Sequence, residues 1–220
     1  MKPKLSKPRP KQDTAQRIRA AADELFCGRG FAAVSVQDIA HQARVQKALV
    51  FYHFGSKEAL FEQILEGYYQ AHRDALATAY AGAGTVRERL HRMIDAYLTF
   101  MADHARYAAL IQQQVGSPET HPLIERNLAP LFTWIEQALA ELTPASGPLA
   151  PRHFFLTFSG TVINYFTYAP LLAPLWGSDP TAAAALDERR RHVHWLVDTV
   201  LDALTAARPP RPRSGQSSRG

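Results

Sequence analysis

The sequence of 220 residues contains one cysteine, Cys27, and has no long hydrophobic run. A single cysteine excludes an internal disulfide framework and suits a reducing compartment. The uninterrupted apolar stretches fall far short of the ~18 residues that cross a bilayer, which excludes a transmembrane helix. Residues 1–11 are basic and proline-rich and lack the apolar segment of a secretory signal. We therefore expect a cytoplasmic protein with no membrane partner.

Sequence signatures of enzymes and metal sites are also missing. The chain has no Gly-rich phosphate loop, no Gly-x-Ser-x-Gly and no His-Glu-x-x-His. The nine histidines are scattered, and the closest two, His192 and His194, would point about 200° apart on a helix and chelate poorly. We therefore expect no catalytic activity, no cofactor and no metal.

Acidic residues are absent from both ends of the chain. Residues 1–11 and 208–220 hold nine of the 25 basic residues, so the body between them carries 16 basic against 20 acidic residues. Within the body, residues 12–60 are nearly balanced, whereas residues 61–207 have 10 basic and 15 acidic side chains. Basic arms often bind polyanions such as DNA, although solvated tails that only keep a protein soluble have the same composition. We expect a flexible basic arm at residues 1–11 and a disordered basic tail at 208–220.

Proline is absent between Pro10 and Pro118, and β-branched residues show almost no alternation there. Apolar residues recur instead with the spacing of an amphipathic helix. Capping boxes begin at Ser35 and Thr85, where the residue three positions later is acidic. These patterns predict an all-α fold with about nine helices, near residues 12–28, 35–42, 46–52, 56–80, 85–103, 104–115, 119–141, 150–171 and 181–207. Within these, Pro122 and Pro130 are expected to fray or kink the helix over 119–141.

Residues 35–52 contain two predicted helices of about eight residues, each too short to be stable alone in water. Ser35 caps the first, and Lys47 lies near the start of the second. Two short helices joined by a tight turn are typical of a helix-turn-helix, whose second helix enters the major groove of DNA. Residues 12–60 are therefore predicted to form a three-helix DNA-binding domain. Taken singly, the aromatic residues of the second helix would more often pack than touch DNA, and for Phe54 we expect packing.

The run from Ser35 to Phe61 carries a more specific pattern. It reads Ser-Val-Gln-Asp-Ile-Ala at 35–40, Val-Gln-Lys at 45–47 and Phe-Tyr-His-Phe-Gly-Ser-Lys-Glu-Ala-Leu-Phe at 51–61. Together with Leu25-Phe26 and Gly28-Arg29-Gly30-Phe31, it resembles the tetracycline-repressor (TetR) family over about residues 12–61. The resemblance implies a homodimeric transcriptional regulator that binds a palindromic DNA operator.

The resemblance also implies which residues face DNA. Arg44 occupies a turn position that is usually glycine, where a left-handed backbone costs a non-glycine residue ~1 kcal/mol. Phe51 stands where tyrosine is usual, so a hydroxyl–phosphate hydrogen bond is absent there. Lys57 follows the cap Ser56 at a helix N-terminus, which favours an anion, so its amine is expected to hold a phosphate. The residues expected on the DNA-facing surface are Gln37, Arg44, Lys47, Ala48, Leu49, Phe51, His53 and Lys57.

Residues 61–207 are rich in aromatic and small residues, which suits helices packed around a cavity. The resemblance implies a ligand-binding and dimerisation domain here, with the last two long helices forming the two-fold interface. Polar and aromatic residues on apolar helices are the ligand candidates, although ordinary core packing is an alternative for each: Tyr97, Met101, Tyr107, Gln112, Trp134, Asn164 and Tyr165. The apolar stripes predicted for the dimer interface, which could also pack within one chain, are Phe155, Phe158, Val162, Phe166, Val193, Val197, Val200 and Leu204.

The sequence therefore predicts a DNA-binding transcriptional regulator, a repressor that a small hydrophobic molecule releases from its operator. The alternative is a helical small-molecule carrier or enzyme with a vestigial helix-turn-helix. Salt-dependent binding to a polyanion through Lys47 and Lys57 would distinguish the two, because a carrier has no need of it.

Overall fold

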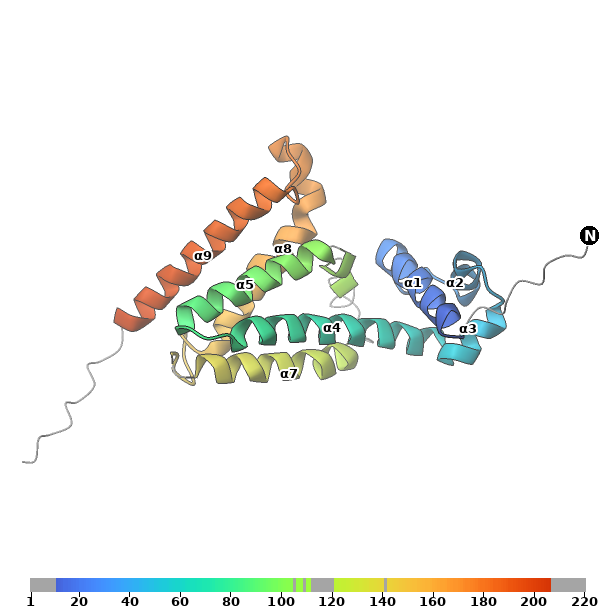
Figure 1. Cartoon of the computed structure of the whole chain (residues 1–220), viewed down its shortest axis with the longest axis horizontal. Coiled ribbons are helices and arrows are strands. Elements are labelled where there is room, and N and C mark those ends of the chain that lie inside the picture. Colours follow the sequence, from blue (N-terminus) through green and yellow to red (C-terminus); the bar gives the residue numbers. More distant parts are fainter. Residues whose placement is uncertain (1–10, 105, 109, 112–120, 141, 207–220) are drawn as a thin grey trace, which may run out of the picture.

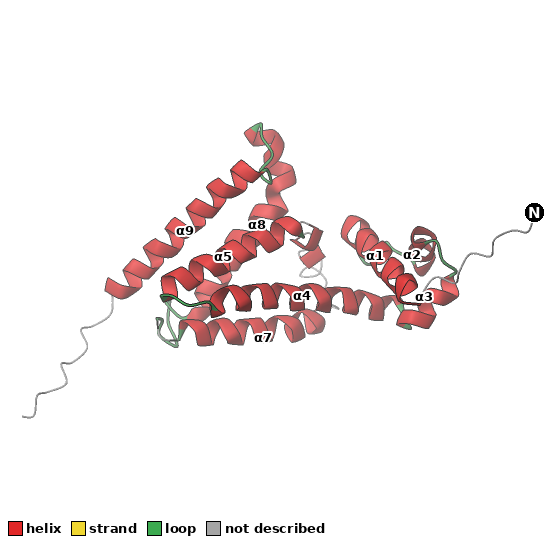
Figure 2. Ribbon diagram, viewed as in Figure 1, coloured by secondary structure: helices red, strands yellow, loops and turns green. Residues whose placement is uncertain are grey.

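The computed structural model describes residues 11–104, 106–108, 110–111, 121–140 and 142–206. Within these ranges every assigned element is a helix and no strand occurs, so the predicted all-α fold is confirmed there (Figure 2). Residues 106–108 and 110–111 are also helical. The helices with assigned bounds are α1 (Lys11–Arg29), α2 (Val36–Ala43), α3 (Lys47–Phe54), α4 (Lys57–Ala81), α5 (Val86–Asp103), α7 (His121–Leu139), α8 (Pro151–Trp176) and α9 (Ala183–Ala206).

Helices α7 and α8 both continue through internal prolines. Pro122 lies in the first turn of α7, where its missing N–H would have no helical partner anyway, and Pro130 lies inside the same helix. Pro170 and Pro174 lie inside α8, which continues past its expected end at residue 171 to Trp176. Gly177 then closes the helix in a left-handed conformation, with φ 66° and ψ 18°.

Helices α1, α2 and α3 form a small unit at one end of the molecule, next to the start of α4 (Figure 1). Its core holds Ile18 and Phe26 from α1, Ile39 from α2 and Val50 from α3, each at most 1% exposed. Ser35 Oγ accepts from the Asp38 N–H while the Asp38 carboxylate accepts from the Ser35 N–H, which confirms this capping box. The cap of α2 and the burial of both short helices against α1 thus stabilise them, rather than their own propensity.

Arg44 ends α2 in the left-handed region, with φ 55° and ψ 49°, and is the one non-glycine residue with positive φ in the described ranges. Its N–H donates to the Ala40 and His41 carbonyls. The Arg17 guanidinium donates to the Ala43 and Arg44 carbonyls, which fixes the turn from the α1 side. The strained turn conformation expected at this position is confirmed.

Replacing Arg44 with glycine should make the protein about 1 kcal/mol more stable than replacing it with alanine. Both substitutions remove the guanidinium, so only the left-handed backbone distinguishes them, and denaturant unfolding of the two variants measures the difference. Equal stabilities would mean that the turn stores no strain.

Helix α4 extends from the N-terminal unit into the larger unit, where it lies beside α5 and α7 (Figure 1). Leu60, Phe61 and Leu65 of α4 belong to the N-terminal core, whereas Tyr69 and Leu76 belong to the core that α5, α7, α8 and α9 complete. One continuous helix therefore connects the two cores across the boundary expected near residue 60. Among the described helices, none combines the length and apolar composition of a bilayer span.

Candidate functional site

Helix α3 is held to the N-terminal unit by Val50, which is 1% exposed, and presents most of its other residues to solvent. Gln46, Lys47, Ala48 and Leu49 at its N-terminal end are all exposed. Phe51 is 44% exposed and lies 5.7 Å below the Lys47 ammonium. Lys47 therefore points to an open face of the molecule.

The remaining predicted DNA contacts surround α3. Gln37, in the first turn of α2, and Arg44, in the turn, are exposed, whereas His53 is half-buried beside Tyr52 and Phe54. Phe54 packs against the core of the unit, as expected. The surface defined by Gln37, Arg44, Lys47, Ala48, Leu49 and Phe51 is called the α3 face below.

Lys57 has a different environment from the one that the sequence suggests. Its Nζ donates to the Phe31 carbonyl at 3.1 Å and to the Val34 carbonyl at 3.0 Å, and it lies 4.1 Å from the centre of the Phe31 ring. The amine thereby fixes the segment between α1 and α2. An ammonium has three N–H donors, so one remains for the phosphate contact, which stays a prediction.

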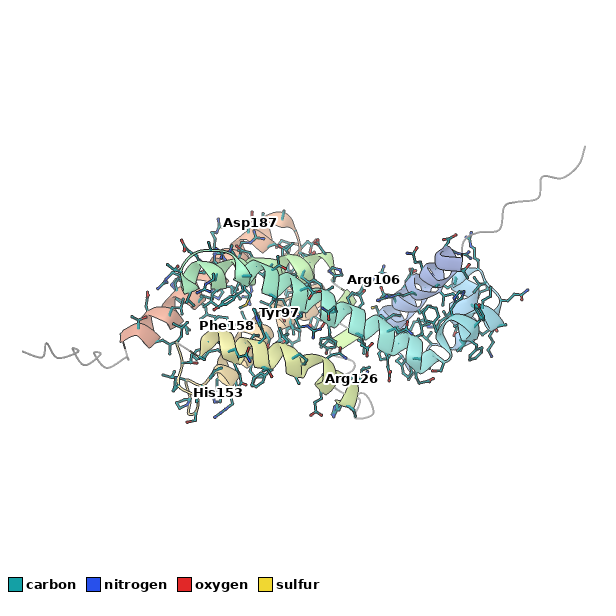
Figure 3. All side chains as sticks on the ribbon, turned by 60° about the horizontal axis from the view of Figure 1, so that its bottom comes forward. Tyr97, Arg106, Arg126, His153, Phe158 and Asp187 are labelled. Carbon is teal, nitrogen blue, oxygen red and sulfur yellow. The ribbon has the colours of Figure 1, made fainter. Side chains whose placement is uncertain are left out.

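The larger unit contains a cavity of about 270 Å³ between α4, α5, α7, α8 and α9. Tyr97 and Phe158, both of which line it, lie in the body of this unit in Figure 3. Leucine, isoleucine, valine and phenylalanine make up most of the wall, and the described lining residues include no Lys, Arg, Asp or Glu. The polar groups that line it belong to Tyr69, His72, Tyr97, Tyr107, Thr143 and Ser159.

His72 is the most unusual of these lining groups. It is 5% exposed, and neither ring nitrogen has a hydrogen-bond partner in the described parts of the chain. Its ring packs 4.5 Å from the Tyr97 ring and 5.1 Å from the Phe100 ring. Burial lowers the pKa of His72 to about 4, so the imidazole is neutral near pH 7.

Comparison with known proteins supports the assignment of the N-terminal unit. Residues 18–64 match the family model described as bacterial regulatory proteins, tetR family. This match covers α2 and α3 completely and includes Lys47 and its exposed neighbours. The N-terminal domain of this chain belongs to the tetR family.

Relatives and solved structures extend the likeness of this chain beyond residue 64. It is 28% identical over 112 residues to the HTH-type transcriptional regulator YttP of Bacillus subtilis, which covers 50% of this chain and 54% of YttP. It is 26% identical over 165 residues to the repressor NemR of Escherichia coli, and this match covers 74% of this chain and 80% of NemR. The chain thus spans about half the length of YttP, and 31% of the HTH-type transcriptional regulator Mb3439c of Mycobacterium bovis.

Solved structures agree in fold over most of the chain. The transcriptional regulator FadR of Bacillus subtilis, crystallised with stearoyl-CoA, superposes with a TM-score of 0.63 at 19% identity, and the match covers 88% of this chain and 99% of the FadR chain. A tetR-family structure from Shewanella sp. PV-4 gives a TM-score of 0.62 at 24% identity. This match covers 86% of this chain and 97% of the Shewanella chain. At these identities the likeness establishes the fold of the larger unit.

The predicted ligand residues separate into those that line the cavity and those that do not. Tyr97 and Tyr107 line it, whereas Gln112 lies outside the described residues. Met101 is fully buried in the core, and Trp134 packs against Tyr80 at 5.5 Å. Asn164 is exposed, and the Tyr165 hydroxyl donates to the Pro180 carbonyl at 2.7 Å. These last four residues do not line the cavity, because a polar or aromatic type does not tell which neighbour a helix faces, and their contact with a ligand stays a prediction.

The apolar residues that the sequence predicts for the dimer interface pack instead within a single chain. Val162, Phe166, Val193 and Val197 are at most 5% exposed within a single chain, where α8 and α9 pack against α5. Phe155, Phe158, Val197, Val200 and Leu204 line the cavity. These stripes therefore form the core of one chain. The large apolar side chains that α8 and α9 expose are Leu156, Tyr168, Leu171, Leu175, Trp176 and Trp195.

A group of contacts that the sequence did not suggest joins the tetR-family domain to the cavity. Tyr68 of α4 donates from its hydroxyl to the Asp23 carboxylate of α1 at 2.9 Å, and its ring stacks on that of Tyr107 at 5.1 Å. Tyr107 itself lines the cavity. Burial raises the pKa of Tyr68, and the Asp23 carboxylate raises it further. Arg106 lies at the same junction (Figure 3).

Proposed function

We propose that this protein is a transcriptional repressor that binds a palindromic DNA operator as a homodimer through the α3 face. The observation that carries this proposal is the exposure of the N-terminal end of α3, which begins with Lys47, while Val50 and Phe54 pack the other side of the helix against the N-terminal core. An α-helix fits the major groove, and the side chains at its N-terminal end are nearest the bases. The names of relatives such as NemR, a repressor, agree with this role.

The second part of the proposal is a homodimer built by the exposed apolar residues of α8 and α9 that are named above. The surfaces that carry these residues are called the outer faces of α8 and α9 below. Clusters of exposed large apolar side chains mark interaction sites on soluble proteins. Leu171, Leu175 and Trp195 are 65%, 77% and 60% exposed, which is unusual for residues of this size on a monomer. A two-fold interface that pairs these faces would place two copies of α3 on one duplex, with half-sites about one helical turn (~34 Å) apart.

The third part is release of DNA by a small molecule in the cavity. A ligand changes DNA affinity only if it binds two conformations of the protein with different affinities. Residues 110 and 111 occupy the junction between the units. Leu110 is buried in the N-terminal core, whereas Ile111 lines the cavity and also packs against that core. Filling the cavity would displace this segment and, with it, the tetR-family domain.

Lys47→Ala should weaken DNA binding and reduce its salt dependence. If each copy of Lys47 neutralises one phosphate, the log–log salt slope falls by about 0.9 per copy. Gel retardation at several salt concentrations, with a fragment selected from the organism's own DNA, measures both changes. Arg152→Ala is the matched control, because it removes one exposed positive charge from α8, outside the tetR-family domain. A carrier with a vestigial helix-turn-helix would bind no DNA at all, and unchanged binding by Lys47→Ala would exclude the α3 face.

Tyr68→Phe should leave DNA binding intact but weaken its release by ligand. The substitution keeps the ring stacked on Tyr107 and removes the hydrogen bond to Asp23, worth about 1 kcal/mol, or roughly fivefold in the coupling between ligand and DNA. The measurement is the shift in DNA affinity that a saturating ligand causes. Tyr80→Phe is the control, because its hydroxyl bonds the Ala138 carbonyl within the larger unit. Equal loss of coupling in both variants would refute a specific role for Tyr68.

A further inference from the structure

The cavity wall contains polar groups that the packing of the protein does not satisfy. Thr143 is the contrasting case, because its hydroxyl donates to the Leu139 carbonyl at 3.0 Å. His72 is 95% buried, yet neither of its ring nitrogens has a hydrogen-bond partner among the described residues. A buried polar group without a partner costs free energy, so such groups in native structures usually bind a ligand, an ion or a water molecule, or have another functional reason.

The position of the His72 ring is fixed by aromatic packing rather than by hydrogen bonds. Tyr97 and Phe100 of α5 pack within 4.5 and 5.1 Å of its centre, and Tyr107 lies 6.2 Å away. This arrangement holds the ring while both nitrogens at its edge remain available. A neutral imidazole has one N–H donor and one acceptor nitrogen, which is the complement of a hydroxyl group.

We propose that the cavity binds an uncharged, mainly apolar compound with a hydroxyl group, a phenol or an alcohol, and that this hydroxyl hydrogen-bonds to His72. The identification of this compound as the effector rests on the proposed function, but its binding does not. The volume of about 270 Å³ holds on the order of ten to twenty non-hydrogen atoms.

Charge is excluded from this ligand by the composition of the wall. No described lining residue has a charged side chain that could pair with a carboxylate, a phosphate or an ammonium. Burying an unpaired ion costs several kcal/mol. The neutral state of His72 supports the same conclusion, because its lowered pKa leaves no cation at neutral pH. The effector therefore differs in chemistry from the acidic stearoyl-CoA bound in the FadR structure.

The test is calorimetric titration of the full chain at pH 7.5 with matched compounds. These are 4-butylphenol, butylbenzene, which lacks the hydroxyl, and 4-butylbenzoate, which is ionised. The phenol should bind about tenfold more tightly than butylbenzene, the effect of one net hydrogen bond, and the benzoate at least 100-fold more weakly than the phenol. Titration with 1-decanol distinguishes an alcohol from a phenol as the source of the hydroxyl.

His72→Phe, which keeps a ring of similar shape, should abolish the preference for the hydroxyl compound and leave binding of butylbenzene unchanged. His72→Gln restores a donor and an acceptor and should recover part of the preference. Thr143→Val is the matched control, because it removes the cavity hydroxyl that is already bonded within the protein. The control should keep the preference.

Three results would overturn the proposal: tight binding of the benzoate, a phenol preference that survives in His72→Phe, or no binding by any of the four compounds. All titrations are made without DNA. Failure of the repressor proposal would appear in gel retardation and would leave these titrations unchanged, so the two failures are distinguishable.

Discussion

Trp195→Asp should convert the proposed dimer into a folded monomer that binds the proposed operator DNA at least about 100-fold more weakly. Trp195 is 60% exposed on α9, so its replacement removes little packing from the single chain. In a two-fold interface the substitution would bury a carboxylate without a partner on each side, which costs several kcal/mol. Loss of the second half-site contact then removes the 10²- to 10⁴-fold gain that linked binding sites provide.

Sedimentation and gel retardation together measure this result. Leu149→Asp is the matched control, because Leu149 is 41% exposed but lies in the connection between α7 and α8 and belongs to neither α8 nor α9. The control should remain a dimer and bind DNA normally. If Trp195→Asp is still a dimer, the outer face of α9 is not the interface.

The N-terminal domain could be predicted from the sequence because its signals are local. Ser35, Asp38 and the short spacing to Lys47 act over a few residues, and the resulting helices have the predicted starts to within one residue. The left-handed backbone of Arg44 could also be predicted, although glycine is usual at this position. The geometry of the turn imposes that conformation whatever the side chain is.

The larger unit could be predicted only as a set of helices. Periodicity shows that α8 and α9 have an apolar face, but it does not show which neighbour covers that face. Val162 and Val193 are buried within the chain, whereas Leu171 and Leu175, which directly follow Pro170 and Pro174 in α8, are exposed. Only the packing of α5 against α8 and α9 distinguishes the buried sides of these two helices from their outer faces.

His72 also escaped prediction, although a weak signal exists. On α4, Tyr69, His72 and Leu76 follow the spacing of one helical face, so a histidine interrupts an otherwise apolar stripe. A histidine in that position is usually a satisfied core residue. Its missing hydrogen-bond partners and its place on the cavity wall are tertiary facts that no local pattern contains.

The buried state of His72 should make the protein less stable in acid, in a way that His72→Phe removes. The pKa of His72 is lowered from 6.5 to about 4 by burial, so between these values the unfolded chain binds more protons than the folded one. Above pH 6.5 this group has no effect, and the loss is complete below about pH 4. At 1.36 kcal/mol per pKa unit, the full loss is about 3 kcal/mol.

Urea unfolding of wild type and His72→Phe at pH values from 7 to 4 isolates this contribution, because the carboxylates of both proteins titrate alike and cancel in the difference. The variant should gain about 3 kcal/mol relative to wild type as the pH falls. Parallel stability profiles would show that the imidazole can become charged without cost, and hence that water reaches His72 in the folded protein. The same profile measured with saturating 4-butylphenol should be steeper, since the phenol binds only the neutral ring and raises the free energy of protonating it.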